Sequence, residues 1–409
     1  MIPEGWERTT LGRVAKITSG GTPDRNKPEY WGGHIPWVTT SEIGNGPITS
    51  TSEHITEIGL KNSSAKLFPA GTLLMAMYGQ GKTRGKIAQL KIEATTNQAC
   101  AAILTKSAAD ASFLFQNLTA RYDEIRNLSN DGSQKNLSGG LLKALPILLP
   151  PPMERERIAA ITATWDRAIE TVEALIASAR AQKQALMQQL LPQGSTQPKK
   201  RLPGFSGEWR EVRLGNLVKE VNRDVDWDDD ATYKLISVRR RSEGIFHRES
   251  LLGHEILTKA MKVALAGDFL ISKMQIVHGA SALVKTNFDG FNISGSYIAL
   301  VPKDQAKLDI EYFDWYSRTP YFYKLAYISS YGVHIEKMTF NLKSFLKQTI
   351  LVPPSKAEQS AIVEQLNSAK ALIGVYQQQA GALRQEKAAL MQQLLTGKRR
   401  VNLPESEVA

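Results

Sequence analysis

The heptapeptide ALMQQLL stands at Ala185–Leu191 and again at Ala389–Leu395, 204 positions later. Upstream of the two copies, Ile147–Pro151 (ILLPP) corresponds to Ile350–Pro354 (ILVPP). At a separation of 203, the start of the chain also matches its middle: Trp6, Leu11 and Gly12 recur as Trp209, Leu214 and Gly215. Because self-similarity at a fixed period marks a repeated structural unit, the 409 residues form one unit of about 200 residues written twice.

Each unit begins with a stretch that predicts an α+β domain. Short β-type runs alternate with turns rich in Gly, Pro, Asn and Ser, and helical stretches at Ala111–Leu128 and Ile310–Ala326 lie among them. We expect strands at Ile35–Thr39, Thr72–Met77, Ile87–Ile92, Ala101–Thr105, Tyr233–Val238, Asp268–Ser272 and Tyr297–Val301. The predicted organisation is a first domain at 1–151, a helix at 152–192, a linker at 193–207, a second domain at 208–354, a helix at 355–397 and a basic tail at 398–409.

The helix after each domain has the pattern of a coiled coil. Apolar residues recur at steps of three and four from Ile158 past Val172 to Leu186. The second helix has Ile362, Ala369, Tyr376, Leu383 and Leu390 at one seam position and the more polar set Gln365, Leu372, Gln379 and Glu386 at the other. We expect the helices to pair, antiparallel because the repeats are related by a pseudo-two-fold axis. The alternative is that each helix folds onto its neighbouring domain. The residues assigned to helix pairing or to partner subunits are Ile158, Trp165, Val172, Leu186, Leu190, Ile362, Leu372, Leu383, Leu390 and Leu394.

The charge balance and the distribution of cysteine and apolar residues indicate which class of partner and which compartment to expect. Lys and Arg number 51 against 40 Asp and Glu, a net charge of +11. Such an excess favours a polyanionic partner, because neutralising phosphates releases counterions. Cys100 is the only cysteine, no apolar run is long enough for a membrane span, and the first residues lack the regions of a signal peptide. These features lead us to expect a cytoplasmic protein without a membrane partner.

The duplicated motifs resemble the specificity subunit of type I restriction–modification systems. The match rests on Pro146–Ile158, Thr349–Ile362 and the two LMQQLL helix ends, with Ala70–Gly79 and Ala266–Gln275 resembling the family's Gly-x-Leu-Leu strand. Thr95–Ile103 and Asp131–Ile147 are also similar to the family, so the resemblance covers essentially the whole chain.

The resemblance implies two target-recognition domains, each reading one half-site of an asymmetric double-stranded DNA target, with the helices setting the gap. It also implies a scaffold for two methyltransferase subunits and, optionally, for restriction subunits that translocate and cleave DNA. The chain would then be non-catalytic and would hold no cofactor, because S-adenosylmethionine, ATP and Mg are expected on the partner subunits.

Polar loops supply candidate DNA-binding residues in both domains. Gln, Asn, Arg and Lys carry the donors and acceptors that match base edges in the major groove, although each such residue singly is more often a solvated surface group. The first domain offers Gln80, Lys82, Thr83 and Arg84 in one loop and Ser133, Gln134, Lys135 and Asn136 in another. The second domain offers Arg239, Arg240 and Arg241 after one strand, Lys273, Gln275 and His278 after another, and His334 and Lys337 in a later loop.

Catalytic alternatives find little support. Ala76–Thr83 fits a relaxed phosphate-loop pattern, but such a loop must open a helix, and Lys86–Ile92 reads as a strand. The six histidines have no metal-ligand spacing, and the acidic cluster at Asp226 and Asp228–Asp230 reads as a solvated turn, with Ca²⁺ binding as the remote alternative. Two competing classes remain, a self-sufficient enzyme that uses this loop and a coiled-coil adaptor that binds only proteins.

Overall fold

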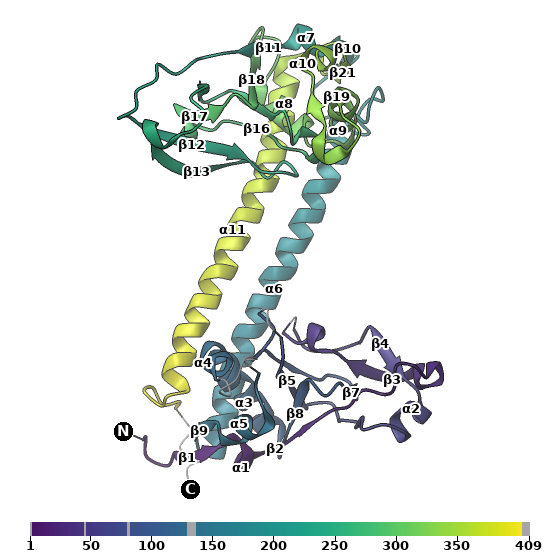
Figure 1. Cartoon of the computed structure of the whole chain (residues 1–409), viewed down its shortest axis with the longest axis vertical. Coiled ribbons are helices and arrows are strands. Elements are labelled where there is room, and N and C mark those ends of the chain that lie inside the picture. Colours follow the sequence, from purple (N-terminus) through teal and green to yellow (C-terminus); the bar gives the residue numbers. More distant parts are fainter. Residues whose placement is uncertain (1, 45, 80–81, 129–135, 403–409) are drawn as a thin grey trace. The chain divides into compact units, whose positions relative to one another are not determined.

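The computed structural model describes residues 2–44, 46–79, 82–128 and 136–402. The chain divides into two compact units, of which unit 1 combines Met1–Glu173 with Gln378–Ala409 and unit 2 is Ala174–Gln377. Each unit holds one α+β region and parts of the two long helices, α6 (Pro152–Leu190) and α11 (Lys356–Leu394). Figure 1 shows the strands of each α+β region beside segments of the two long helices.

Unit 1 contains two sheets and a two-stranded ribbon. The larger sheet has the antiparallel order β2-β8-β5-β6, the smaller one has the order β4-β3-β7, and β1 pairs with β9. The strands are β1 (Glu7–Thr10), β2 (Ala15–Ser19), β3 (Trp31–Val38), β4 (Glu53–Ile55), β5 (Leu73–Ala76), β6 (Ile87–Gln89), β7 (Thr95–Thr96), β8 (Cys100–Thr105) and β9 (Pro146–Leu149). The short helices are α1 (Leu11–Val14), α2 (Glu57–Lys61), α3 (Ala108–Ala120), α4 (Tyr122–Asn127) and α5 (Gly139–Ala144).

Unit 2 repeats this topology. Its sheets have the orders β11-β18-β15-β16 and β13-β12-β17-β14, β10 pairs with β21, and a further ribbon joins β19 to β20. The strands are β10 (Arg210–Arg213), β11 (Val218–Val221), β12 (Thr232–Val238), β13 (Ile245–Leu252), β14 (Met261–Ala264), β15 (Phe269–Ser272), β16 (Ser281–Leu283), β17 (Phe291–Ser294), β18 (Tyr297–Pro302), β19 (Ser330–Tyr331), β20 (Thr339–Phe340) and β21 (Thr349–Val352). The helices are α7 (Leu214–Leu217), α8 (Ile310–Tyr316), α9 (Pro320–Ile328) and α10 (Leu342–Phe345).

The central strand of each unit lies between two hydrophobic cores. In β5, Leu73 and Met75 join one core while Leu74 and Ala76 join the other. Successive side chains of a strand point to opposite faces, so a continuous apolar run buries both faces at once. The strands predicted at Thr72–Met77 and Asp268–Ser272 are confirmed as β5 and β15, and the structure places both inside their sheets. The two predicted helices at Ala111–Leu128 and Ile310–Ala326 are each divided in two, as α3 with α4 and α8 with α9.

The long helices pack against each other within both units. In unit 1, Ile158 of α6 shares a core with Met391 and Leu394 of α11, while in unit 2, Leu190 shares a core with Ile362. Within unit 1, Lys387 pairs with Asp166 and Arg384 with Glu173, so rising residue numbers on α11 meet falling numbers on α6. The helices therefore run antiparallel there, as predicted.

The polar seam that we predicted for α11 is wrong by one position. The buried residues that follow Ile362 at the second seam position are Leu366, Ile373 and Ala380. A heptad pattern permits a step of either three or four after Ile362, and the contacts of the folded chain select four. The second seam position is therefore largely apolar, and the set assigned to it from the sequence is exposed: Gln365, Leu372, Gln379 and Glu386.

The other residues assigned to helix pairing have mixed positions. Ile158, Val172, Leu190, Ile362 and Leu394 are buried. Leu372 is 40% exposed and does not belong to the seam. The remaining residues of the set are partly buried: Trp165, Leu186, Leu383 and Leu390.

A buried glutamate near the start of each long helix joins three distant segments. Trp6 Nε1 and Arg400 Nε both donate to Glu154, each at 2.5 Å. In unit 2, Trp209 Nε1 donates to Glu358 at 3.2 Å and Arg201 Nη2 donates to the same carboxylate at 2.7 Å. We call each set a glutamate latch.

The latches change the interpretation of two segments. Arg201 lies in the stretch predicted as an extended linker, and Arg400 lies in the predicted basic tail. Both arginines instead bind a carboxylate that is at most 3% exposed. Both segments are therefore held against their units, and the composition of neither segment indicates this contact.

The corrected seam predicts opposite outcomes for two adjacent residues. Ile373→Asp places a carboxylate at a position that is 8% exposed, and we expect it to destabilise unit 2 by more than about 3 kcal/mol. Leu372→Asp, at the exposed neighbour, should change the free energy of unfolding by less than about 0.5 kcal/mol. Urea unfolding of both variants tests this, and equal losses would contradict the assigned seam.

The latch gives a second prediction. Glu358→Ala leaves the buried indole N–H of Trp209 without its acceptor, so we expect a loss of about 1–3 kcal/mol in the free energy of unfolding. Glu364→Ala removes an exposed carboxylate from the same helix and serves as the matched control. If both variants unfold at the same urea concentration, the latch contributes nothing to stability.

Candidate nucleic-acid interface

In unit 1 the candidate residues lie on the connection between β5 and β6. The hydroxyl of Tyr122 donates to the carbonyl of Lys82 at 2.6 Å, and Arg84 Nη2 donates to the carbonyl of Arg126 at 3.0 Å. Helix α4 therefore fixes the backbone of this connection, while the Lys82 side chain remains exposed and Thr83 is partly buried. Gln80 lies outside the described residues.

The second predicted segment of unit 1 adjoins the first. The backbone N–H of Leu137 donates to the carbonyl of Met77 at 3.0 Å, which brings the partly buried Asn136 beside the β5–β6 connection. Ser133, Gln134 and Lys135 lie outside the described residues. Two stretches that are more than 50 positions apart in the sequence thus meet at one end of the central strand.

Unit 2 has the same arrangement at the corresponding place. The N–H of Phe340 donates to the carbonyl of Lys273 at 2.9 Å, so the segment after β15 meets the one that follows His334 and Lys337. His334 and Lys337 are exposed, whereas Gln275 and His278 are partly buried. The Lys273 ammonium is already bound, because it donates to the carbonyl of Gly295 at 2.8 Å.

A strained turn between β12 and β13 completes the group in unit 2. The N–H of Arg241 donates to the His278 carbonyl at 2.7 Å, and the N–H of Ser242 donates to the Gly279 carbonyl at 2.8 Å. Arg241 and Ser242 have φ values of 58° and 54°, in the left-handed region that costs a residue with a side chain about 1–2 kcal/mol. Strain of this kind persists only where surrounding contacts impose it, and it is concentrated at functional sites.

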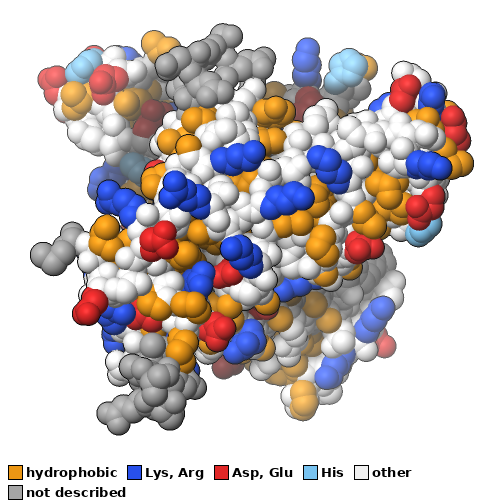
Figure 2. Space-filling model, turned by 90° about the horizontal axis from the view of Figure 1, so that it is seen from below, with side chains coloured by type: hydrophobic (Ala, Val, Ile, Leu, Met, Phe, Trp, Pro, Cys, Tyr) orange, Lys and Arg blue, Asp and Glu red, His pale blue; other side chains and the backbone are white. Residues whose placement is uncertain are grey.

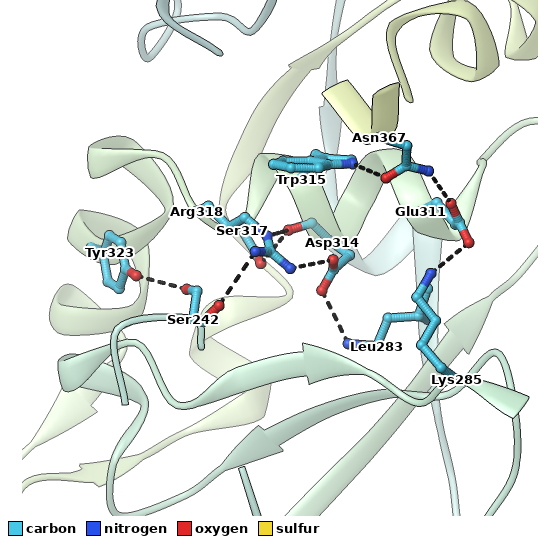
Figure 3. Close-up of polar contacts among 10 residues, drawn as sticks. All are labelled: Ser242, Leu283, Lys285, Glu311, Asp314, Trp315, Ser317, Arg318, Tyr323 and Asn367. Atoms are coloured by element: carbon cyan, nitrogen blue, oxygen red, sulfur yellow. Dashed lines mark hydrogen bonds and ion pairs between the residues drawn. The ribbon is translucent and has the colours of Figure 1, made fainter. Parts of the chain in front are cut away.

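Side chains from α9 and from the short connection between α8 and α9 hold the strained turn in place. The Ser242 hydroxyl hydrogen-bonds the Tyr323 hydroxyl at 2.7 Å, and Arg318 Nη1 donates to the Ser242 carbonyl at 3.3 Å (Figure 3). Arg318 is itself fixed by an ion pair with Asp314 at 2.7 Å. The structure thereby adds two positioning residues, Arg318 and Tyr323, that the sequence did not indicate.

Glu336 links the remaining candidates of unit 2. Its carboxylate lies 3.8 Å from Arg240 Nη2 and 3.5 Å from His278 Nε2. Three segments predicted separately therefore converge: the turn between β12 and β13 that holds Arg239–Ser242, which we call the arginine turn, the β15–β16 connection and the β19–β20 loop. Arg239 lies apart from this contact, with its guanidinium 4.5 Å from the centre of the Phe246 ring. No sequence signal connects Glu336 with these residues, because the contacts span up to 96 positions.

Basic side chains are numerous on the surface of the protein (Figure 2). In Figure 2, Lys and Arg side chains are distributed along the face that is drawn rather than gathered at one point. The chain as a whole has a net charge of +11. Such an excess of positive charge favours a polyanionic partner.

A catalytic centre is not apparent among the residues that the structure describes. They contain no group of three or more metal-ligating side chains. Burial raises the pKa of the Cys100 thiol to about 12, so it is no nucleophile near neutral pH. The phosphate-loop-like segment is followed by strand β6 and not by a helix. Within the described residues, no helix is long and apolar enough to cross a membrane.

The comparisons with known proteins agree on one family. Residues 3–180 match the family model described as "Type I restriction modification DNA specificity domain". The MjaIX specificity subunit of Methanocaldococcus jannaschii is 29% identical over 41% of this chain and 40% of its own length. The EcoR124I/EcoR124II specificity subunit of Escherichia coli is 30% identical over 39% and 41%, respectively. The chain thus spans about two fifths of the length of these two relatives.

Other similarities extend over the whole chain. The MjaVIII specificity subunit of M. jannaschii is 22% identical over 98% of this chain and 94% of its own. A chain from a structure of type I restriction–modification complex assembly has a TM-score of 0.60 at 20% identity, covering 98% of this chain and all of its own. The S subunit from M. genitalium has a TM-score of 0.56 at 13% identity, covering 98% and 97%. These structures establish the fold.

The strained turn yields a prediction about stability. Ser242→Val places a β-branched residue at a positive φ and should destabilise unit 2 by about 1–2 kcal/mol beyond Ser242→Ala. The alanine variant is the control because it removes the same hydroxyl without adding branching, and Ser242→Gly should be at least as stable as alanine. Urea unfolding midpoints give the order, and a valine variant as stable as alanine would refute the strain.

Proposed function

Since the chain carries a type I restriction–modification DNA specificity domain and has the fold of specificity subunits, we propose that it reads a bipartite, asymmetric DNA target for a methyltransferase complex. Each unit reads one half-site. One observation carries the proposal: the hydrogen bonds from Leu137 to Met77 and from Phe340 to Lys273 give both repeats the same pair of adjoining polar segments at the same end of the central strand.

Differences between the two reading surfaces support an asymmetric target. The described candidates of unit 1 are Lys82, Thr83, Arg84 and Asn136, whereas unit 2 presents an arginine turn and two histidines. Direct readout depends on the arrangement of donors and acceptors in the groove, so different side chains select different bases. A conserved framework with divergent loops therefore recognises two unlike half-sites.

The long helices serve as spacer and scaffold. Each contains 39 residues, which corresponds to about 58 Å at 1.5 Å per residue and sets the unread gap between half-sites. In unit 2 they carry exposed apolar side chains, with Leu175 and Leu372 each 40% and Val375 57% exposed. We assign these residues to contacts with methyltransferase subunits, which also gives Leu372 a role outside the seam. S-adenosylmethionine and the methyl-transfer chemistry belong to those subunits, and restriction subunits, where present, complete the complex.

Exchange of one reading region tests the proposal. Residues 1–151 are replaced by the matching part of a related specificity subunit, and the host genome is sequenced for methylated bases. We expect one half-site to change while the other half-site and the gap are retained, because each unit has its own core and its own loops. The reciprocal exchange of residues 208–354 is the control. A methylome that changes in both halves after a single exchange would contradict independent reading.

A further inference from the structure

Three cations converge on the helix pair in unit 2 without an acidic partner. Arg180 and Lys183 of α6 and Lys370 of α11 line a groove together with Gln377 and Ile373. Among the residues that the structure describes, none of the three cations forms an ion pair. Burial lowers the pKa of both lysines, and neighbouring cations, Arg318 among them, lower it further.

In the other repeat, the equivalent cations form ion pairs within the protein. Arg384 and Lys387 of α11 occupy in unit 1 the positions that Arg180 and Lys183 occupy in unit 2, 204 residues earlier. There Lys387 binds Asp166 at 2.6 Å and Arg384 binds Glu173. The same shift takes those two acids to Lys370 and Gln377. An acid is thus replaced by a lysine and another by a neutral amide, so the helix pair does not require this charge pattern for packing.

The acids near the groove are already engaged. Asp314 forms an ion pair with Arg318 at 2.7 Å, and Glu311 pairs with Lys285 at 2.6 Å (Figure 3). Their fields partly offset the repulsion at Lys370, since both raise its pKa while Arg318 and Lys285 lower it. The three cations therefore retain their capacity for an external anion.

The groove lies near the arginine turn, and this position indicates that the external anion is DNA phosphate. Arg318 lies close enough to lower the pKa of both lysines, and its guanidinium also donates to the carbonyl of Ser242 in the arginine turn. Arg318 thus lies between the reading turn and the three cations of the groove. DNA that leaves the half-site on this turn presents phosphates at regular spacing along such a path.

We propose that Arg180, Lys183 and Lys370 bind the phosphate backbone of the unread spacer DNA next to the half-site read by unit 2. The proposal deepens the proposed function and rests on it. Because phosphate contacts fix register without reading sequence, the cluster holds the spacer on the helices whatever its bases are. The equivalent cations of unit 1 are neutralised by acids, so unit 1 lacks these phosphate contacts. Only unit 2 therefore binds the spacer backbone in this way.

The test converts unit 2 to the charge pattern of unit 1. Lys370→Asp with Gln377→Glu supplies Lys183 and Arg180 with the acids found in the other repeat, so folding should be preserved. The full chain is assembled with its methyltransferase subunits and titrated with a duplex carrying the target identified from methylated sites. We expect affinity to fall about three- to tenfold and the slope of log affinity against log salt to decrease by about one to two.

Two further variants support the comparison. Lys347→Asp with Gln305→Glu makes the same change in net charge at exposed positions of unit 2 outside the groove, and its affinity should stay near that of the wild type. Lys370→Gln removes one charge without adding an acid and should lose about one unit of salt slope or less, which keeps the test valid if the double variant misfolds.

The outcomes separate this inference from the proposed function. A groove variant that matches the wild type in affinity and salt slope overturns the spacer contact while leaving target reading intact. A variant that no longer retains methyltransferase subunits overturns it in favour of an acidic protein surface as the partner of the cluster. A wild-type complex that does not bind DNA overturns the proposed function and the inference together.

Discussion

A carboxylate buried near the start of each long helix is the constraint that brings distant segments of each unit together. Glu154 and Glu358 are 2% and 1% exposed, and a buried charge is tolerated only when it is paired and hydrogen-bonded. Each therefore requires an indole from the beginning of its α+β region and a guanidinium from the segment that precedes that region or ends the chain. The need to satisfy one charge brings together three segments in each unit, and Arg400 takes in unit 1 the place that Arg201 takes in unit 2.

This frame separates stability from recognition. The central strands β5 and β15 are covered on both faces by packed side chains, so their ends have fixed positions. The polar connections that follow them carry the variable chemistry, and neighbouring helices restrain them through contacts such as Tyr122 with Lys82 and Tyr323 with Ser242. A rigid support can also hold strained backbone, as at Arg241 and Ser242, where packing and hydrogen bonds offset the cost of a positive φ.

Because the chain is duplicated, equivalent residues of the two repeats can be compared at many positions. Where the two repeats agree, as in the glutamate latches and the strand orders of the larger sheets, the shared feature serves the fold. Where they differ at equivalent positions, the fold permits either choice. The helix pair shows agreement and difference within a few turns. The apolar seam recurs in both repeats, whereas Asp166 and Glu173, which form ion pairs in the first copy, are replaced by a lysine and a glutamine in the second.

The sequence by itself determined the duplication, the two long helices and the strands at Thr72–Met77 and Asp268–Ser272, because repeated motifs and the periods of apolar residues are local properties. It also indicated most of the loops of the candidate interface, since Gly, Asn, Lys and Arg cluster where strands end. It could not choose between steps of three and four after Ile362, because both fit a heptad and only the opposing helix decides. Nor could it show that Arg201 and Arg400 bind buried glutamates, or that Glu336, Arg318 and Tyr323 join the arginine turn to segments far along the chain. Those contacts depend on charge compensation and packing between distant segments, and only the tertiary structure brings such partners within reach of each other.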